Sequence, residues 1–346
     1  MRFIRLGDTH LGVKQGSDVM LKFQLDYLRY VFEYCRSNDI EVIYQLGDFF
    51  DVRKFVYVNA LMGVHNLLEE YKDIRIEWAP GNHDQTTKTD LSLSAGYALA
   101  KMSKNFIANR EFSTKTIDGK KITLVPWLCQ ENAAQWERLK NDGSDLVMGH
   151  FEITGFPFYQ GVDCEHGLSA DDFKNFDAVA SGHFHTRSSK GKIEYLGSPY
   201  HLTWADHKDG TNRGFDVFDT STMTATKVDN AVDQSIFRSI DYRDGYSGSM
   251  EELCGKIVHI NVHDKKNAST YGDFIKEVDA YSLGFKTSDL TLKEVMSTDK
   301  DELHTFDRLG QILKFVESQD KVISEGLPEI ITELYNKASA EDKSLC

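Results

Sequence analysis

The sequence predicts a layered α/β domain, with β-sheets inside and helices outside, followed by a smaller domain and a helical C-terminal segment. Two observations support this. The first two thirds alternate short strand-like runs with amphipathic stretches at helical spacing, and five of those runs end in Gly followed by Asp, Asn or His. The 346 residues fit about two domains. Hydrophobic residues at 40% and charged residues at 27% are typical of a globular protein and exclude low-complexity, collagen-like and coiled-coil chains.

The expected strands of the first domain, residues 1–230, are short apolar runs: Arg2–Leu6, Val42–Leu46, Arg75–Trp78, Ile122–Trp127, Asp145–Met148, Asp177–Ala180, Ile193–Leu196 and Phe215–Phe218. A helix is expected between the first two, with Leu21, Leu25, Leu28, Phe32 and Cys35 on one stripe. A second helix carries Val56, Ala60, Val64 and Leu67. The pattern loosens into a polar stretch from Asn230 to Gly248, which indicates a domain boundary.

Residues 231–296 are expected to form a small α+β domain from the strand Ile257–Val262, a helix over Tyr271–Tyr281 and the strand Leu290–Val295. Residues 297–346 are expected to form two amphipathic helices. The first carries Leu303, Phe306, Leu309, Leu313 and Val316, and Pro328 opens the second. The residues alone leave open whether these helices pack on their own domain or dock onto a partner helix.

Charge and cysteine content restrict the environment and the partners. The net charge is −14, so a nucleic acid would have to be bound through local basic patches, a metal site or a partner. The five cysteines are widely spaced and form no Cys-x-x-Cys motif, which favours a reducing, cytoplasmic compartment over a disulfide framework or a zinc knuckle. We expect no membrane span and no signal peptide, since no apolar run approaches ~18 residues.

Five segments share one pattern: an apolar strand, then Gly, then a residue that can bind a metal. These residues are Asp8 with His10, Asp48, Asn82 with His83, His150, and His183 with His185. Because the carboxyl ends of strands line one crevice, we expect them to converge. The ligand set of Asp, His, Asp, Asn and three further His, seven side chains without His83, is too many for one tetrahedral zinc but suits two ions sharing a bridging carboxylate. Mixed imidazole and carboxylate ligands favour Mn²⁺, Fe²⁺ or Zn²⁺ over Mg²⁺.

These segments resemble, in order, the five motifs of the calcineurin-like metallophosphoesterases: Asp8-x-His10, Gly47-Asp48-x-x-Asp51, Gly81-Asn82-His83-Asp84, Gly149-His150 and Gly182-His183-x-His185. LGDTHLGV, LGDFFDVRK, SGHFHT and YLGSPYHLT resemble the SbcD-type nuclease subunits, whose eukaryotic relative is the nuclease of the MRN break-repair complex. LVPWLCQEN and GHFEITGFPFYQG resemble segments of the recombination-nuclease subunits of T-even-type bacteriophages. The resemblance covers residues 1 to about 200. It implies a four-layer metallophosphoesterase β-sandwich flanked by helices, with a small α+β cap domain that binds DNA and a C-terminal helical pair.

The resemblance also implies roles for individual residues. Asp8, His10 and His185 would hold one metal, and Asn82, His150 and His183 the other, with Asp48 bridging both. His83 would protonate the leaving oxygen or stabilise the transition state. Archaeal and eukaryotic relatives carry His at the position of Asp51. Asp51 instead matches the general phosphoesterase pattern, in which this Asp orients the catalytic His, and its carboxylate would raise the pKa of His83.

The function implied by the resemblance is a Mn²⁺-dependent DNA exo- and endonuclease with two divalent ions, acting in break processing, recombination and replication. The expected partners are double-stranded DNA ends, an SbcC-type ABC ATPase bound through the C-terminal helices, and a second copy of the chain. The dimer is expected at the stripe through Val56, Ala60, Val64 and Leu67. A phage-encoded member would act in the host cytoplasm.

Two other functions share the same motifs: a phosphodiesterase or phosphatase on this scaffold, and a scaffold protein that has lost catalysis. The SbcD-like stretch after His185 and the long extension after Asn230 disfavour the first, and the complete ligand set disfavours the second. Some basic residues near the motifs either grip DNA phosphates or belong to solvated loops: Arg53, Lys54, Arg187, Lys190 and Lys192.

Overall fold

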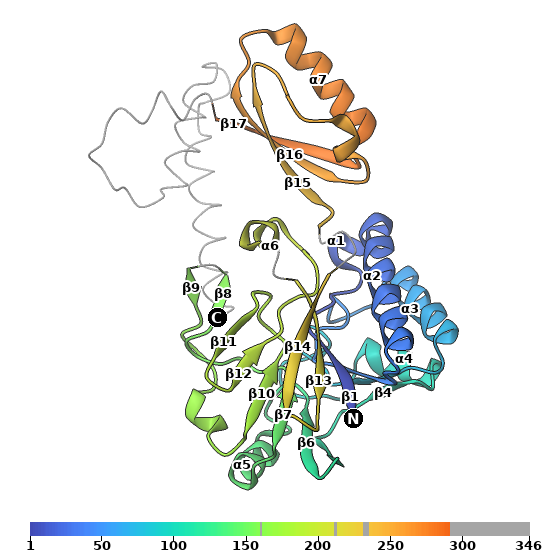
Figure 1. Ribbon diagram of the computed structural model, residues 1–346, viewed down its shortest axis with the longest axis vertical. Helices are drawn as coiled ribbons and strands as arrows, with labels where there is room; N and C mark the ends of the chain where they lie inside the picture. The colour runs from blue at the N-terminus through green and yellow to red at the C-terminus, as the bar shows by residue number, and fades with distance from the viewer. Residues whose placement is uncertain (160, 211–212, 231–234, 291–346) are drawn as a thin grey trace, which may run out of the picture. The chain divides into compact units, whose positions relative to one another are not determined.

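The computed structural model describes residues 1–159, 161–210, 213–230 and 235–290 (Figure 1). Met1–Asn261 and Lys265–Ser288 form one compact unit. The expected C-terminal helices at 297–346 lie outside the described residues. Within the described residues, no helix is long and apolar enough to cross a membrane.

The first of two six-stranded sheets has the order β14-β13-β1-β2-β3-β4. Strands β1 to β4 are parallel, whereas β13 runs antiparallel to β1, and β14 antiparallel to β13. The bounds are β1 Arg2–Leu6, β2 Val42–Gln45, β3 Arg75–Trp78, β4 Phe106–Ala108, β13 Gly214–Asp219 and β14 Thr224–Asp229.

The second sheet has the order β11-β12-β10-β7-β6-β5. Its inner strands β6, β7, β10 and β12 are parallel, and each edge strand is antiparallel to its neighbour. The bounds are β5 Ser113–Ile117, β6 Lys120–Val125, β7 Leu146–Gly149, β10 Ala178–Ser181, β11 Ser188–Lys190 and β12 Ile193–Tyr195. A two-stranded hairpin adds β8 Pro157–Tyr159 and β9 Val162–Asp163.

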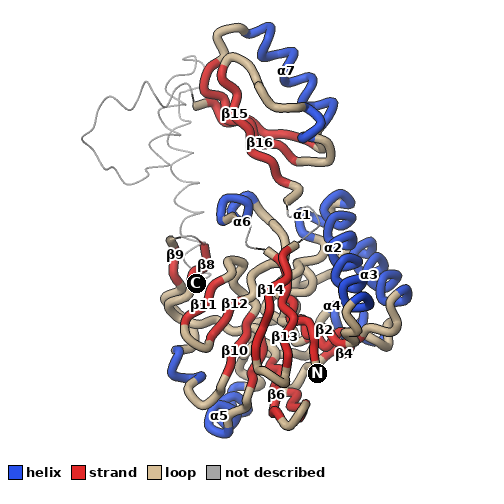
Figure 2. The backbone as a smooth tube through the Cα atoms, in the orientation of Figure 1, coloured by secondary structure: helices blue, strands red, loops and turns tan. Residues whose placement is uncertain are grey.

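The two large sheets pack face to face through one apolar cluster, which includes Phe3 and Tyr44 from the first sheet and Ile122 and Met148 from the second. Helices cover the outer faces (Figure 2). The helices are α1 Val13–Gly16, α2 Asp18–Ser37, α3 Val58–Glu70, α4 Ala95–Met102, α5 Ala133–Asp142 and α6 Trp204–Asp209, with a 3-10 helix η1 at Ala170–Phe173. Helices α2, α3 and α4 pack on the first sheet, while α5 and η1 pack on the second. The predicted four-layer α/β sandwich is therefore confirmed.

The stripe expected to form a dimer instead faces the chain's own core. Ala60, Val64 and Leu67 are at most 3% exposed and pack in the cluster that joins α3 to α2 and the first sheet. The apolar residues left exposed in and just before α3 are Phe55, Val58 and Met62, at 56%, 74% and 40%. The expected position of the dimer stripe was therefore wrong, because an amphipathic pattern marks an apolar face without showing what covers it.

A three-stranded sheet of order β15-β16-β17 follows the first domain, with β15 Phe237–Arg243, β16 Ile257–Asp264 and β17 Gly284–Asp289. Helix α7, Ala268–Tyr281, packs on it through Phe274, whose ring lies 4.7 Å from that of Tyr242, and η2 spans Met250–Leu253. Strand β15 occupies part of the stretch expected to be loose. The strand expected at Leu290–Val295 lies, apart from Leu290, outside the described residues.

Candidate active site

The predicted site residues follow the carboxyl ends of five strands. Asp8 and His10 follow β1, Asp48 follows β2, Asn82 and His83 follow β3, His150 follows β7, and His183 with His185 follow β10. Strands β1, β2 and β3 are neighbours in one sheet, and β7 and β10 are neighbours in the other. The two sheets therefore deliver their polar turns to one edge of the sandwich, as the strand–Gly–ligand pattern predicts.

Three groups of ligand-type atoms form at this edge, and within each group the atoms lie within 4.8 Å of one another. Two of them contain expected metal ligands alone: Asp8, His10 and His185 form one, and Asp48, His150 and His183 the other. The third joins His10 to Asp51 and His83. Asp48 connects the first two groups, since its Oδ2 lies 3.5 Å from Nε2 of His10 and 3.4 Å from Nε2 of His150. Asn82 joins the second group, with its Oδ1 2.9 Å from Nε2 of His150 and 3.1 Å from Nδ1 of His183.

The donor set fits a pair of divalent cations. Nε2 of His10 and Nε2 of His185 face each other at 3.1 Å, although only one of two neutral imidazoles can donate across such a contact. Nε2 of His183 is buried, and no hydrogen-bond partner for it lies among the described residues. A cation placed between Nε2 of His10 and Nε2 of His185, beside the carboxylates, would use the lone pairs that the protein leaves facing one another.

Glycines admit the ligands into this space. A Cβ atom added to Gly81 would lie 2.3 Å from Oδ1 of Asp48, and one added to Gly182 would lie 2.6 Å from Oδ1 of Asp8. Both contacts are closer than real Cβ atoms approach other heavy atoms. Gly81 of the third motif and Gly182 of the fifth are therefore required by close packing around the carboxylates.

Three of the candidate ligands adopt strained backbone conformations. The φ angles of His10, Asp48 and His183 are 42°, 51° and 89°. The amides of Thr9 and His10 donate to the carbonyl of Asp48 at 3.1 and 2.9 Å, and the amide of His183 donates to Oδ1 of Asp8 at 2.9 Å. Such strain persists only where surrounding bonds enforce it, and it is concentrated at functional sites.

The histidines of the site differ in the direction of their pKa shifts. Burial lowers the pKa of His10, but the hydrogen bond to Asp51 and the charges of Asp48 and Asp8 outweigh burial and raise that pKa to about 9. Burial also lowers the pKa of His150, and there the charges of Asp48 and Asp8 raise it to about 9. Burial lowers the pKa of His183 to about 3. Burial would raise the pKa of Asp48, yet the nearby imidazoles hold it well below its usual range. The site therefore concentrates negative charge on Asp48, between the two groups.

The structure corrects the expected role of the Asp51 carboxylate. Its Oδ1 lies 3.1 Å from Nδ1 of His10, while Nδ1 of His83 lies 2.8 Å from the backbone carbonyl oxygen of Asp51. The expected carboxylate–His83 pair was therefore wrong, because motif spacing does not show which oxygen of Asp51 meets the ring. The expected rise in the pKa of His83 was also wrong: burial lowers that pKa.

Several supporting residues were not predicted as site residues. Gln24, in the middle of α2, donates from Nε2 to the carbonyls of Thr9 and His10 at 2.9 and 2.8 Å, and the Tyr200 hydroxyl donates to Thr9 at 2.6 Å. Nothing in the helical pattern marks Gln24 as different from a surface glutamine. Asp206 of α6 lies beside His185, and its only sequence signal is a Thr-x-x-Asp helix start.

Asp84, the last residue of the third motif, joins two turns of the site. Its carboxylate accepts the amides of Phe49, Phe50 and Gly81 at 2.8–3.1 Å. Burial and the neighbouring Asp48 raise its pKa to about 7. Asp84 therefore ties the loop after β2 to the loop after β3.

Most of the basic residues near the motifs are held by the protein itself. Arg187 binds Asp216, Lys190 binds the carbonyl of Gly155, and Lys192 donates to two carbonyls in the loop just after η1. Arg53 is close enough to His83 to help lower its pKa. Of this set, Arg53 is therefore the residue whose charge acts on the site.

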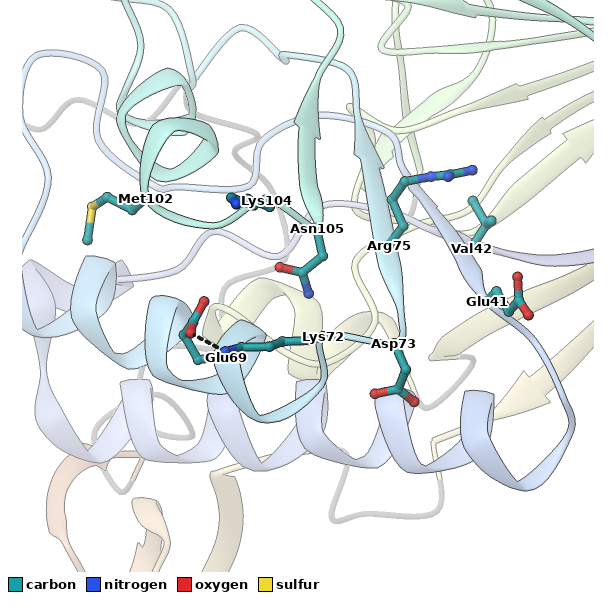
Figure 3. A pocket seen from close by; sticks show the side chains of 9 residues that line it. All are labelled: Glu41, Val42, Glu69, Lys72, Asp73, Arg75, Met102, Lys104 and Asn105. Carbon is teal, nitrogen blue, oxygen red and sulfur yellow. Dashed lines mark ion pairs between the residues drawn. The ribbon is translucent and has the colours of Figure 1, made fainter.

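A cavity of about 660 Å³ lies at the opposite ends of β2 and β3, where these strands begin (Figure 3). It is lined by Glu41, Val42, Glu69, Lys72, Asp73, Arg75, Met102, Lys104 and Asn105. Its acidic and basic side chains balance, and Lys72 is paired with Glu69 at 2.8 Å. Volume alone does not make this cavity the active site, because the convergent ligand-type groups lie at the other edge of the sheet.

Residues 1–187 match the calcineurin-like phosphoesterase family, and the chain belongs to this family. The chain is also similar to Exonuclease subunit 1 of Enterobacteria phage T4, with 32% identity over 307 residues, covering 82% of this chain and 90% of that protein. Among solved structures, a novel archaeal phosphodiesterase aligns with a TM-score of 0.36 at 15% identity, covering 66% of this chain and 99% of that one. A second solved structure aligns with a TM-score of 0.41 at 9% identity over the same shares.

Proposed function

We propose that this protein is the nuclease subunit of a DNA-processing complex and hydrolyses phosphodiester bonds with two divalent ions, Mn²⁺ in particular. The observation that carries the proposal is the pair of ligand-type groups joined by Asp48, with His83 beside them. The name of the phage T4 relative, an exonuclease subunit, supports DNA as the substrate and a multi-subunit assembly.

The site would hold its ions in the two groups described. Asp8, His10 and His185 would bind one ion, Asn82, His150 and His183 the other, and Asp48 both. When bound, the ions would polarise the phosphate of the substrate and activate a water molecule for attack. The carboxylate oxygens and the Asn82 oxygen would bind the two cations, and the buried imidazoles would exclude bulk water from the site.

His83 would supply the proton for the leaving oxygen. Its Nδ1–H donates to the Asp51 carbonyl at 2.8 Å, which orients the ring and leaves Nε2 for the substrate. Burial lowers the pKa of His83, so its imidazolium is a stronger acid than a free histidine. The negative charge of a bound phosphate would raise the population of this imidazolium, and Arg53 would help to hold that phosphate.

We further propose that the chain works as a homodimer, with an SbcC-type ABC ATPase bound through residues 297–346, in the cytoplasm. The exposed apolar residues Phe55, Val58 and Met62 support a dimer surface that differs from the stripe first expected. The cysteines of the described residues are all free thiols, which fits a reducing compartment. A chain truncated after residue 296 should lose ATPase binding and keep hydrolysis of a small phosphodiester.

The test is hydrolysis by the purified protein with Mn²⁺, with and without the ATPase, of blunt, nicked and hairpin duplexes and of an aryl phosphodiester. We expect cleavage of both substrate classes, abolished by chelation and by Asp48→Ala. Hydrolysis of the aryl diester without cleavage of any duplex would instead identify a phosphodiesterase of another substrate class. Activity that persists in Asp48→Ala would contradict the two-metal site.

A further inference from the structure

Asp206 lies in the short helix α6, outside the five motifs, yet it reaches a candidate metal ligand. Its Oδ1 lies 3.4 Å from Nδ1 of His185, and the residue is 1% exposed. The other ring nitrogen of His185, Nε2, points into the site, 3.1 Å from Nε2 of His10 and 4.0 Å from Oδ2 of Asp8. The imidazole of His185 therefore spans the space between Asp206 and the first group of ligand-type atoms.

The carboxylate of Asp206 is fixed in this orientation from its other side. Oδ2 accepts hydrogen bonds from the amides of Leu202 and Thr203 at 3.1 and 2.7 Å and from the Thr203 hydroxyl at 2.8 Å. These bonds belong to the capping box that starts α6. Because Oδ2 is used by three donors, Oδ1 is the oxygen left for the imidazole.

Arg213 braces the same arrangement. Its Nη1 donates to the carbonyl of His185 at 2.5 Å and to Oγ of Ser198 at 2.7 Å, and its Nη2 donates to the carbonyl of Asp206 at 3.2 Å. One buried guanidinium thus joins the backbone of the ligand to the backbone of its neighbour. The Asp206–His185 distance is set by main-chain contacts on both sides.

We propose that Asp206 is a positioning residue that selects the metal-binding tautomer of His185. A histidine binds a metal through a nitrogen lone pair, so Nε2 must be unprotonated and the proton must sit on Nδ1. An anionic acceptor next to Nδ1 favours that tautomer and raises the basicity of Nε2. This inference rests on the proposed two-metal site. It adds a carboxylate–histidine–metal triad, in which Asp206 orients the imidazole that binds the ion.

Asp206→Asn is the informative change. The three donors around Oδ2 fix the amide oxygen on the capping side, so the amide NH₂ would face Nδ1 of His185. Nδ1 must then accept, which moves the proton to Nε2 and blocks the lone pair that would bind the ion. We expect one of the two ions to bind about 10–100-fold more weakly, the usual effect of losing such a support.

Two controls separate this role from helix capping. Thr203→Ala removes the hydroxyl of the capping box but keeps the Asp206 carboxylate beside His185. Asp172→Asn weakens a second capping box, in which Asp172 accepts the amide and hydroxyl of Ser169 at 2.9 and 3.2 Å in η1. Both variants should retain the affinity for both ions.

The experiment uses the full chain labelled with ¹⁵N-histidine. Long-range ¹H–¹⁵N spectra of the metal-free protein report the tautomer of His185, whose signals are assigned by their absence in His185→Gln. A Mn²⁺ titration then reports the stoichiometry and affinity of binding. We expect the proton on Nδ1 in the wild type and both controls, and on Nε2 in Asp206→Asn. An unchanged tautomer or full affinity in Asp206→Asn would overturn the inference, as would the same loss in Thr203→Ala. A wild-type protein that binds fewer than two Mn²⁺ would instead refute the proposed function.

Discussion

The alanine substitution of Gly81 tests how closely the site is packed. A Cβ at this position would lie 2.3 Å from Oδ1 and 2.4 Å from the amide nitrogen of Asp48, and 2.9 Å from Cε1 of His150. Gly81 is not among the glycines with positive φ, so alanine meets steric conflict without backbone strain at its own position. Since one of the three conflicting atoms is main chain, a side-chain rotation cannot relieve the contact, and the turn that carries Asp48 must move by about 1 Å.

A displacement of about 1 Å in a catalytic group typically costs about 100-fold in rate, so Gly81→Ala should lower kcat/KM for an aryl phosphodiester by about that factor at saturating Mn²⁺. Overpacking should also cost about 1–3 kcal/mol of unfolding free energy, measurable by denaturant titration. The matched control is Gly272→Ala in α7, where a Cβ would meet nothing within 4 Å. That variant should keep its activity and gain up to about 1 kcal/mol. Activity of Gly81→Ala within twofold of wild type would refute the close packing around Asp48.

Two further predictions concern protons. His83→Gln should lower hydrolysis by about 10²–10⁴-fold while binding both ions with wild-type affinity, measured by Mn²⁺ titration; loss of an ion would make His83 a ligand instead. Protein freed of metal should release protons when it binds Mn²⁺ at pH 7.5, because His10 and His150, with pKa values raised to about 9, are protonated there and must become neutral to bind. Affinity should rise with pH up to about 9, and calorimetry in buffers of different ionisation enthalpy would show the release; a pH-independent affinity would contradict this.

The fold could be predicted where apolar runs end in glycine. All eight strands expected in the first domain are present, with ends shifted by two residues at most. The missed strands lie at sheet edges. Two of them, β5 and β14, have only exposed and partly buried positions, so they lack the continuous apolar runs of inner strands. Strand β15 was missed for a related reason: only three of its seven residues are buried.

The convergence of the ligand-type residues could be predicted because parallel strands place their carboxyl ends together. Their supports could not, because a support is defined by one contact in space. Asp51 shows the limit: the motif marks the residue, but the structure shows that its carbonyl orients His83 and its carboxylate faces His10. Gln24 and Asp206 sit at ordinary helical positions, and only the packing of α2 and α6 brings them to the site.

The most direct test of the two-metal account is anomalous diffraction from crystals of the full chain soaked in Mn²⁺. The account predicts two peaks about 3.5–4 Å apart, both within coordination distance of Asp48. One should also contact Asp8, His10 and His185, and the other Asn82, His150 and His183. A single peak, or peaks that do not share Asp48, would contradict it.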